Sequence, residues 1–252
     1  MSNLHNMFRA CFVSDIHISS PDDTEGLRFL EFLKDLSGKE NITHLFLLGD
    51  IFDLWVGDHS IFIERYKNII HEFKRLIDEG AQITYFEGNH DLYLRSFWQE
   101  ELGINVQEAP QYFVLENFTL RLEHGDQMDP DDQQYLFLRW FLRSYFIRKF
   151  FEYLPGWIVD KLGKQSSSKS RIYSTNFRAS SKEKIIKKMH EYARKSHELK
   201  EFDILIAGHL HIRDDSNLFS RKGKFRSVNL GSWENPCYFE IKNTGGRFIE
   251  LE

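Results

Sequence analysis

Short apolar runs alternate with longer amphipathic segments along the first two thirds of the chain, a rhythm typical of α/β folds. Six short runs predict strands, at residues 8–14, 44–48, 82–86, 112–115, 118–123 and 203–207. Three segments with helical periodicity predict helices, at residues 24–36, 61–78 and 180–200. The tail, residues 224–251, alternates as strands do and has turn sequences at Asn235-Pro236 and Gly245-Gly246.

Residues 133–162 break this rhythm, because they form a long aromatic stretch with helical spacing. Its apolar residues cover more than one narrow helical stripe, and basic residues are interspersed among them, including Arg139, Arg143, Arg148 and Lys149. These charges argue against a membrane span, since each charged residue at mid-bilayer costs several kcal/mol. We therefore expect a single domain over residues 1–252 that carries a helical insertion at about residues 131–170.

Composition and charge narrow the class of protein. The 252 residues can bury a full core, and the shares of 41% hydrophobic and 28% charged residues are ordinary for a globular protein. A formal net charge of −5 argues against a generally cationic nucleic-acid binder, so no nucleic-acid partner is expected. Cys11 and Cys237 supply neither a disulfide framework nor a zinc-type cluster, and residues 1–9 lack the apolar stretch of a signal peptide. We expect a cytoplasmic protein.

Candidate metal ligands stand where the predicted strands end, in five segments: Asp15 and His17, Asp50 and Asp53, Asn89 to Asp91, His124, and His209 with His211. Loops at the carboxyl ends of strands in an open α/β sheet gather at one edge, where such folds bind ligands. Solvation or a local hydrogen bond explains one polar residue at a strand end, but five successive segments favour a shared site. Carboxylate and amide oxygens with imidazole nitrogens suit Mn²⁺, Fe or Zn²⁺. Two ions can share this set if one carboxylate bridges them, and we assign the bridge to Asp50.

The motifs around these residues resemble the ordered motif set of the calcineurin-like metallophosphoesterases. The strings are Asp15-Ile16-His17, Gly49-Asp50-Ile51-Phe52-Asp53, Gly88-Asn89-His90-Asp91, His124-Gly125-Asp126 and Gly208-His209-Leu210-His211. The resemblance implies a four-layer αββα fold, in which two packed mixed β-sheets are flanked by helices. It also implies two divalent cations, for which we favour Mn²⁺. The first would be held by Asp15, His17, Asp50 and His211, and the second by Asp50, Asn89, His124 and His209.

The same resemblance implies a reaction. Two cations about 3.5–4 Å apart bind phosphoryl oxygens, acidify a bridging water and offset charge during in-line displacement. His90 is expected to face the scissile phosphate, as a donor to a nonbridging oxygen or as the acid for the leaving group, with Asn89 beside it. Asp91 is expected to orient His90, and Asp53 to support the metal shell or to cap the following turn.

Further strings resemble the UDP-2,3-diacylglucosamine diphosphatases of lipid A synthesis: residues 49–58, the spacing of His124-Gly125-Asp126 and the following aspartates, residues 166–170 and residues 230–233. This resemblance implies hydrolysis of the diphosphate of UDP-2,3-diacylglucosamine to 2,3-diacylglucosamine 1-phosphate and UMP. Ser168, Lys169 and Arg171 are then expected to bind the diphosphate or the glucosamine phosphate, although a solvated hinge is an alternative interpretation.

The aromatic insertion has two interpretations. It is either a helical hairpin packed on the main domain or a lid. As a lid, its apolar inner wall would bind acyl chains, and its basic and aromatic margin would lie on an anionic bilayer. With an acylated sugar nucleotide as substrate, the lid implies peripheral association with the inner membrane.

His90 departs from the best-known lipid A diphosphatases, which have Arg at this position. Alternative functions are therefore a metallophosphoesterase acting on another phospholipid, phosphodiester or nucleotide diphosphate, and a noncatalytic adaptor on the same scaffold. The complete ligand set argues against the adaptor.

Overall fold

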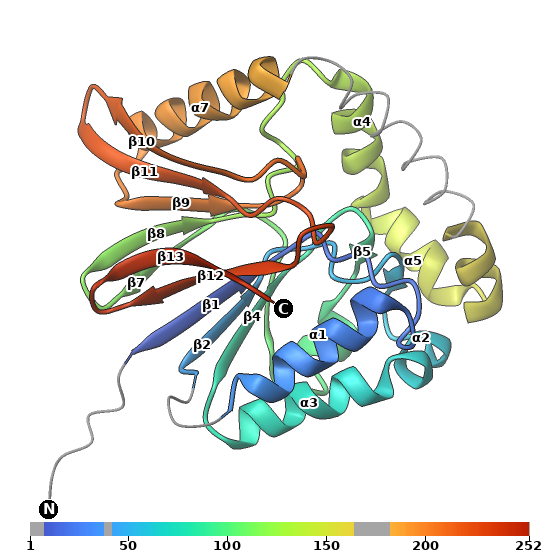
Figure 1. Cartoon of the computed structure of the whole chain (residues 1–252). Helices are drawn as coiled ribbons and strands as arrows, with labels where there is room; N and C mark the ends of the chain where they lie inside the picture. The colour runs from blue at the N-terminus through green and yellow to red at the C-terminus, as the bar shows by residue number, and fades with distance from the viewer. Residues whose placement is uncertain (1–7, 38–41, 164–181, 252) are drawn as a thin grey trace, which may run out of the picture.

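The computed structural model describes residues 8–37, 42–163 and 182–251, in which two β-sheets dominate (Figure 1). The larger sheet contains β1 (Arg9–Val13), β2 (His44–Leu47), β4 (Gln82–Phe86), β6 (Asn105–Gln107), β12 (Cys237–Lys242) and β13 (Gly245–Glu250), in the order β13-β12-β1-β2-β4-β6. The smaller sheet contains β7 (Gln111–Leu115), β8 (Phe118–Leu122), β9 (Ile204–Ala207), β10 (Asp214–Ser220) and β11 (Gly223–Asn229), in the order β10-β11-β9-β8-β7. A short parallel pair joins β3 (Trp55–Val56) to β5 (Asp91–Leu92).

Both sheets are mixed. In the larger sheet β1, β2, β4 and β6 pair in parallel, whereas β12 is antiparallel to both β1 and β13. In the smaller sheet β8, β9 and β11 pair in parallel, and β7 and β10 join the edges in antiparallel. Parallel neighbours end at the same edge of a sheet, so the loops after β1, β2 and β4 lie together, as do those after β8 and β9.

The two sheets pack face to face and helices cover their outer faces. Apolar side chains of both sheets fill the space between them, among them Phe12, Phe46, Leu122, Ile206 and Phe239. Figure 1 shows α1 (Thr24–Asp35) and α3 (Lys67–Asp78) over the larger sheet, and α7 (Lys182–Leu199) over the smaller one. The predicted four-layer fold of two packed mixed sheets flanked by helices is confirmed.

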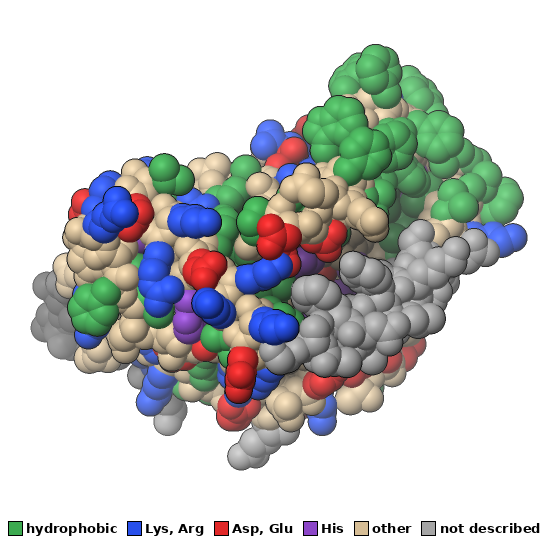
Figure 2. All heavy atoms as spheres, turned by 90° about the horizontal axis from the view of Figure 1, so that it is seen from above, with side chains coloured by type: hydrophobic (Ala, Val, Ile, Leu, Met, Phe, Trp, Pro, Cys, Tyr) green, Lys and Arg blue, Asp and Glu red, His purple; other side chains and the backbone are tan. Residues whose placement is uncertain are grey.

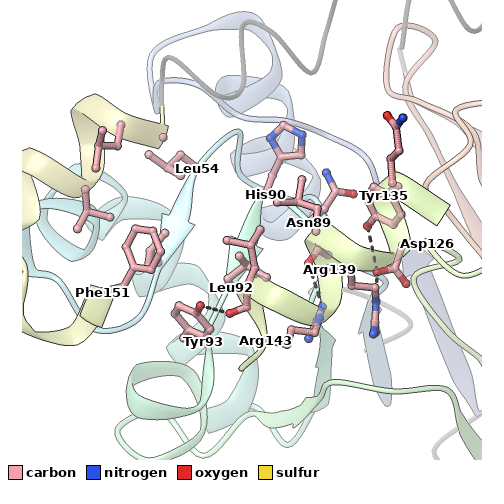
Figure 3. Close-up of a pocket in the computed structure, with 18 of the residues that line it drawn as sticks. Leu54, Asn89, His90, Leu92, Tyr93, Asp126, Tyr135, Arg139, Arg143 and Phe151 are labelled. Carbon is pink, nitrogen blue, oxygen red and sulfur yellow. Dashed lines mark hydrogen bonds and ion pairs between the residues drawn. The ribbon is translucent and has the colours of Figure 1, made fainter. Parts of the chain in front are cut away.

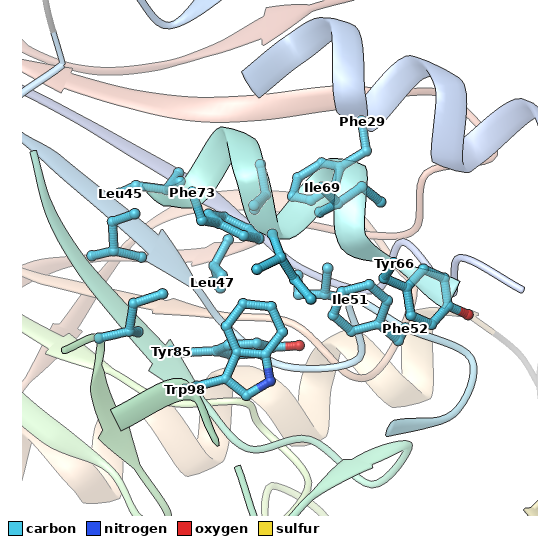
Figure 4. Close-up of a cluster of buried hydrophobic side chains, with 14 of the residues drawn as sticks. Phe29, Leu45, Leu47, Ile51, Phe52, Tyr66, Ile69, Phe73, Tyr85 and Trp98 are labelled. Carbon is cyan, nitrogen blue, oxygen red and sulfur yellow. The ribbon is translucent and has the colours of Figure 1, made fainter. Parts of the chain in front are cut away.

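An aromatic cluster beneath α1 and α3 accounts for much of the high aromatic share of the sequence. Phe29 and Phe73 from these helices lie over Phe52, Tyr66 and Trp98, and all five side chains are buried (Figure 4). Such ring pairs contribute about 0.5–1.5 kcal/mol each beyond the area that they bury. Because Phe52 stands two residues after Asp50, the cluster anchors the loop that carries this candidate ligand.

The helix predicted at residues 61–78 is divided. It consists of α2 (Ser60–Arg65) and α3, and Tyr66 between them has non-helical backbone angles (φ −105°, ψ 19°). The Tyr66 hydroxyl donates to the Ile18 carbonyl at 3.0 Å, and its ring lies 4.4 Å from that of Phe52. The helix therefore breaks where this buried tyrosine contacts the core, which its apolar periodicity alone did not reveal.

The insertion is helical in several pieces. It contains α4 (Gln133–Leu142), α5 (Tyr145–Tyr153) and a helical segment at residues 156–163. Leu154 is extended before Pro155, as expected of a residue that precedes proline, so the second break follows from the sequence. No residue of α4 or α5 is buried. Within the described ranges, no helix combines the length and the apolarity needed to cross a membrane.

Candidate metal centre and adjoining pocket

Five loops at strand ends bring the seven predicted ligands together. The loops after β1, β2 and β4 carry Asp15, His17, Asp50 and Asn89, and the loops after β8 and β9 carry His124, His209 and His211. The first three loops belong to the larger sheet and the other two to the smaller sheet. The site is therefore built across the junction of the two sheets.

Five of these residues have a left-handed backbone: Asp15 (φ 53°), His17 (φ 57°), Asp50 (φ 56°), His209 (φ 69°) and His211 (φ 54°). Each such conformation costs a non-glycine residue about 1–2 kcal/mol. Backbone hydrogen bonds between loops hold it, since the amides of Asp15 and His17 donate to the carbonyls of Gly49 and Asp50 at 3.1 and 3.0 Å. Strain of this kind concentrates at functional sites.

The first cluster contains Asp15, His17 and His211. The Nε2 atoms of His17 and His211 are 3.1 Å apart, and His211 Nε2 lies 3.3 Å from Asp15 Oδ1. The ligand atoms of all three residues fall within 4.8 Å of one another.

The second cluster contains Asn89, His124 and His209. Asn89 Oδ1 lies 3.2 Å from His124 Nε2 and 3.1 Å from His209 Nδ1, and these two nitrogens are 3.2 Å apart. His124 Nδ1 donates to the Leu48 carbonyl at 2.7 Å, so Nε2 is the ring nitrogen that faces the cluster.

Asp50 lies between the two clusters. Its Oδ2 atom is 3.9 Å from His17 Nε2 on one side and 3.6 Å from His124 Nε2 on the other. Its Oδ1 atom accepts from the amides of Asn89 and His90 at 2.8 and 2.9 Å. These bonds fix the carboxylate between the two clusters.

The charge states of these residues suit divalent cations. Burial lowers the pKa of His17 to about 3 and that of His209 to about 4, so both rings are neutral at pH 7. Burial also opposes protonation of His124, but Asp50 and Asp15 outweigh it and raise its pKa to about 9, so a metal ion at Nε2 would displace a proton. Burial likewise opposes ionisation of Asp50, yet the nearby His124, His90 and His17 hold its pKa well below the usual range. Lone pairs from imidazole and carboxylate thus converge at short distances, and the donor set fits a pair of metal ions.

Asp91 has partners other than the predicted one. Its carboxylate accepts from the amides of Asp50, Ile51 and Gly88 at 2.7–3.0 Å and from the Tyr85 hydroxyl at 2.6 Å. In the described part of the chain, none of its hydrogen bonds comes from His90. The expectation that Asp91 orients His90 is corrected, because its oxygens are taken by backbone groups of the β2 and β4 loops. Asp91 joins these loops.

Asp53 is the residue that contacts His90. His90 Nδ1 donates to the Asp53 carbonyl at 2.9 Å and lies 3.8 Å from the Asp53 carboxylate. The His90 ring also meets the His17 ring edge to face, with centroids 4.8 Å apart. His90 therefore stands beside His17 and Asp50, and the ligand atoms of these three residues lie within 4.8 Å of one another.

Comparisons with known proteins decide the family. No family model matches the chain. The UDP-2,3-diacylglucosamine hydrolase of Photobacterium profundum is 31% identical over 232 residues, which are 88% of this chain and 88% of that protein. The chain belongs to the UDP-2,3-diacylglucosamine hydrolase family. The enzyme of that name from Neisseria meningitidis serogroup A is 27% identical over 254 residues, covering 96% of this chain and 98% of the relative.

Membership of the UDP-2,3-diacylglucosamine hydrolase family confirms the resemblance seen in the motifs, and the chain is a hydrolase of the phosphoesterase class. Among solved structures, vacuolar protein sorting 29 of Cryptosporidium parvum aligns with a TM-score of 0.47 at 14% identity, covering 98% of this chain and 92% of that one. The family assignment rests on the sequence match.

In this member of the UDP-2,3-diacylglucosamine hydrolase family, a cavity of about 660 Å³ adjoins the two clusters of candidate ligands. Figure 3 shows Asn89 and His90 between a polar end, with Asp126 and Tyr135, and an apolar end, with Leu54 and Phe151. The lining residues are Leu54, Val56, Gly88, Asn89, His90, Leu92, Tyr93, Asp126, Asp132, Gln134, Tyr135, Leu138, Arg139, Leu142, Arg143, Phe151, Val159, Leu162 and Gly163.

Two arginines of the insertion point inward. Arg139 Nε donates to Asp126 Oδ2 at 2.5 Å, and Arg143 Nη1 donates to Glu87 Oε2 at 2.7 Å. The expectation that they belong to a membrane-facing margin is corrected. Their spacing of four residues puts both on one helix face, opposite Phe137 and Phe141, but does not tell which face turns inward. The sequence patterns also do not single out Asp126, Asp132 or Tyr135 as site residues.

The predicted substrate residues Ser168, Lys169 and Arg171 lie outside the described residues.

Proposed function

We propose that the chain hydrolyses the diphosphate of UDP-2,3-diacylglucosamine and releases UMP and 2,3-diacylglucosamine 1-phosphate. One observation carries this proposal. Two polar clusters that share Asp50 adjoin a cavity of about 660 Å³, and the far end of this cavity is apolar. Ligand pockets of this size class suit molecules that combine one polar reacting group with apolar parts. The names of the relatives support the same substrate.

The proposed metal ligands are those of the two clusters. The first position takes Asp15, His17, Asp50 and His211, and the second takes Asp50, Asn89, His124 and His209, with Mn²⁺ as our proposed ion and Fe or Zn²⁺ as alternatives. Two bound cations would supply charge neutralisation for the phosphoryl oxygens and an acidified water. Asp50 would contribute a ligand to both positions, and two backbone amides restrain its Oδ1 atom.

His90 is our proposed residue for proton transfer or phosphoryl binding. Since its Nδ1 donates to the Asp53 carbonyl, we assign the contact with substrate to Nε2. Asn89 and His90 also line the cavity, so the scissile group would lie at its centre, with the acyl chains towards Leu54, Leu92 and Phe151. Ser168, Lys169 and Arg171 remain proposed ligands of the phosphates.

We propose that the insertion, at about residues 131–170 of one domain, is a lid. Leu138, Leu142, Phe151, Val159 and Leu162 contribute its share of the cavity wall. Figure 2 shows hydrophobic side chains gathered on the protruding part of the molecule that α4 and α5 form. Nine of them are 42% to 86% exposed: Phe137, Leu138, Trp140, Phe141, Tyr145, Phe146, Phe150, Tyr153 and Trp157.

Exposed apolar surface of this extent marks an interaction site. We propose that it rests on the cytoplasmic face of the inner membrane, from which an acylated substrate would enter the cavity. Arg148 and Lys149 lie on α5, pair with Glu152 and are basic residues of this region.

Release of UMP tests the reaction. Purified protein loaded with Mn²⁺ should release UMP from UDP-2,3-diacylglucosamine, lose this activity on chelation and regain it when Mn²⁺ is returned. His124→Ala should abolish it, because this residue is a ligand of the second position. If the loaded protein cleaves simple chromogenic phosphodiesters well but releases no UMP from the lipid, the substrate assignment is wrong and the alternative, a phosphoesterase of other specificity, holds.

Vesicle binding tests the membrane proposal. The double variant Trp140→Ser/Phe146→Ser should bind vesicles of phosphatidylethanolamine and phosphatidylglycerol at least ~10-fold more weakly, since each aromatic side chain removed from the interface forfeits about 1.5–3 kcal/mol. Co-sedimentation with the vesicles measures it. Phe219→Ser is the matched control, because Phe219 is 67% exposed on β10, outside the insertion. Equal binding by the double variant and by wild type would contradict the proposal.

A further inference from the structure

Helix α4 has a polar face towards the protein and an apolar face outward, the reverse of an ordinary surface helix. Phe137, Trp140 and Phe141 are 42% to 66% exposed, whereas Arg139 and Arg143, the residue that caps the helix, point to the core. Apolar burial therefore does little to hold α4. Its inner face is held by two ion pairs, Arg139–Asp126 and Arg143–Glu87, which together are called the α4 latch below.

The first pair of the latch lies beside His124. Asp126 follows His124 by two residues, and its Oδ2 atom accepts from Arg139 Nε at 2.5 Å and from the Tyr135 hydroxyl at 3.1 Å. The Tyr135 ring lies 5.4 Å from the ring of His209. This pair thus contacts the loop that carries His124, a candidate ligand of the second cluster. Tyr135 of the same helix lies beside His209, another candidate ligand of that cluster.

The second pair of the latch lies beside Asn89. Arg143 Nη1 donates to Glu87 Oε2 at 2.7 Å, and Nη2 donates to the Gly88 carbonyl at 3.1 Å. The other Glu87 oxygen accepts from the Leu94 amide at 2.8 Å. Arg143 therefore donates to both the Glu87 side chain and the backbone of the turn that carries Asn89.

Both contacts fall on one side of the metal centre. Asn89, His124 and His209 are the ligands that the second position does not share with the first. Across the described ranges, no hydrogen bond or ion pair joins the side chains of α4 to the loops of Asp15, His17 or His211. Both ion pairs are nearly buried, with side-chain exposures of 19% and 7% for Arg139 and Asp126 and of 13% and 2% for Arg143 and Glu87. A buried pair that loses one partner leaves an uncompensated charge, so its loss displaces the groups around it.

We propose that Arg139 and Arg143 are positioning residues for the second metal position, so that α4 supports this position and not the first. The inference rests on the two-metal site proposed above but does not depend on which phosphoester is cleaved. Outer partners of metal ligands typically change metal affinity by about 10–100-fold. In this chain that change should be confined to one of the two binding steps.

Metal titration of the full chain tests the proposal. Metal-free wild type should take up two Mn²⁺ ions in calorimetry, and the doubly loaded protein should show the electron paramagnetic resonance signal of a spin-coupled pair. Arg143→Ala should weaken Mn²⁺ affinity in the second step by about 10–100-fold and leave the affinity of the first step unchanged. With two equivalents of Mn²⁺ added, the variant should lack the signal of the coupled pair. Arg143→Lys keeps the charge but loses the forked donors, and should give an intermediate second step. It also decides the matter if the alanine variant does not fold.

Arg9→Ala is the matched control, because Arg9 and Glu240 form a pair of similar burial, 14% and 4% exposed, at the start of β1. It should leave both binding steps intact. Unchanged second-step affinity in Arg143→Ala and Arg143→Lys overturns the proposal while the two-metal site stands. Equal weakening of both steps also overturns it, since that is the result of general destabilisation. Wild type that binds no Mn²⁺ overturns the metal site itself.

Discussion

Asp50→Asn is expected to lower kcat for phosphoester hydrolysis by about 10³-fold, the size of effect that follows loss of a preorganised charge in an enclosed site. The amide has the same shape and can still accept from the amides of Asn89 and His90 through Oδ1, at present 2.8 and 2.9 Å away. What it loses is the negative charge that both clusters share. The measurement is kcat on a chromogenic phosphodiester at saturating Mn²⁺, with metal content determined on the same sample.

Asp58→Asn is the control for this substitution. Asp58 is an exposed residue of the same connection, eight positions further along the chain, and the change is chemically identical. Its kcat should equal that of wild type. If Asp50→Asn retains more than about a tenth of the activity while binding two ions, Asp50 does not bridge them.

Gly88→Ala is expected to lower kcat by about 10²-fold and the free energy of unfolding by about 1–3 kcal/mol. A Cβ atom at this position would lie 2.1 Å from Asp50 Oδ1, 2.5 Å from the Asp50 amide nitrogen and 2.8 Å from Asp91 Oδ1. Asp50 and Asp91 are both fully enclosed, so the new methyl group must displace the carboxylate or the turn that carries Asn89. Denaturant unfolding and kcat on the same chromogenic substrate measure the two effects.

Gly103→Ala separates the clash from a general glycine effect. Gly103 has φ +72°, and an added Cβ would meet no atom within 4 Å. Its substitution should lower the free energy of unfolding by about 1–2 kcal/mol, because alanine would have to adopt the left-handed backbone conformation. It should leave kcat unchanged. Near wild-type kcat in Gly88→Ala would show that the turn can move without disturbing the site.

The gathering of the strand-end side chains is the feature of this molecule that the sequence predicts best. Hydrophobic runs locate parallel strands well, and loops after parallel strands must meet, so the strand pattern alone places residues as distant as His17 and His211 together. Roles that depend on fine geometry are less accessible. Asp91 directly follows His90, yet it turns to the amides of Asp50 and Ile51, because sequence adjacency does not fix where a buried carboxylate points.

Strand β10 is an element that the sequence does not predict, and the reason is physical. In β10 only Leu218 is buried, so an edge strand of mostly polar residues has no hydrophobic pattern to reveal it. The inward direction of Arg139 and Arg143 is hidden for a related reason, since an aromatic helix is expected to bury its apolar face. Here tertiary contacts with Asp126 and Glu87 decide the orientation.

Because the candidate ligands are divided between two sheets, bound cations would also have a mechanical role. Asp15, His17, Asp50 and Asn89 come from the larger sheet, and His124, His209 and His211 from the smaller one. Each proposed metal ion would therefore tie one sheet to the other, joining side chains up to 196 positions apart in the chain, as for Asp15 and His211. Cys11 and Cys237 form no disulfide. In such a chain, bound ions act as reversible cross-links, and removing them would loosen the seam between the sheets as well as stop the chemistry.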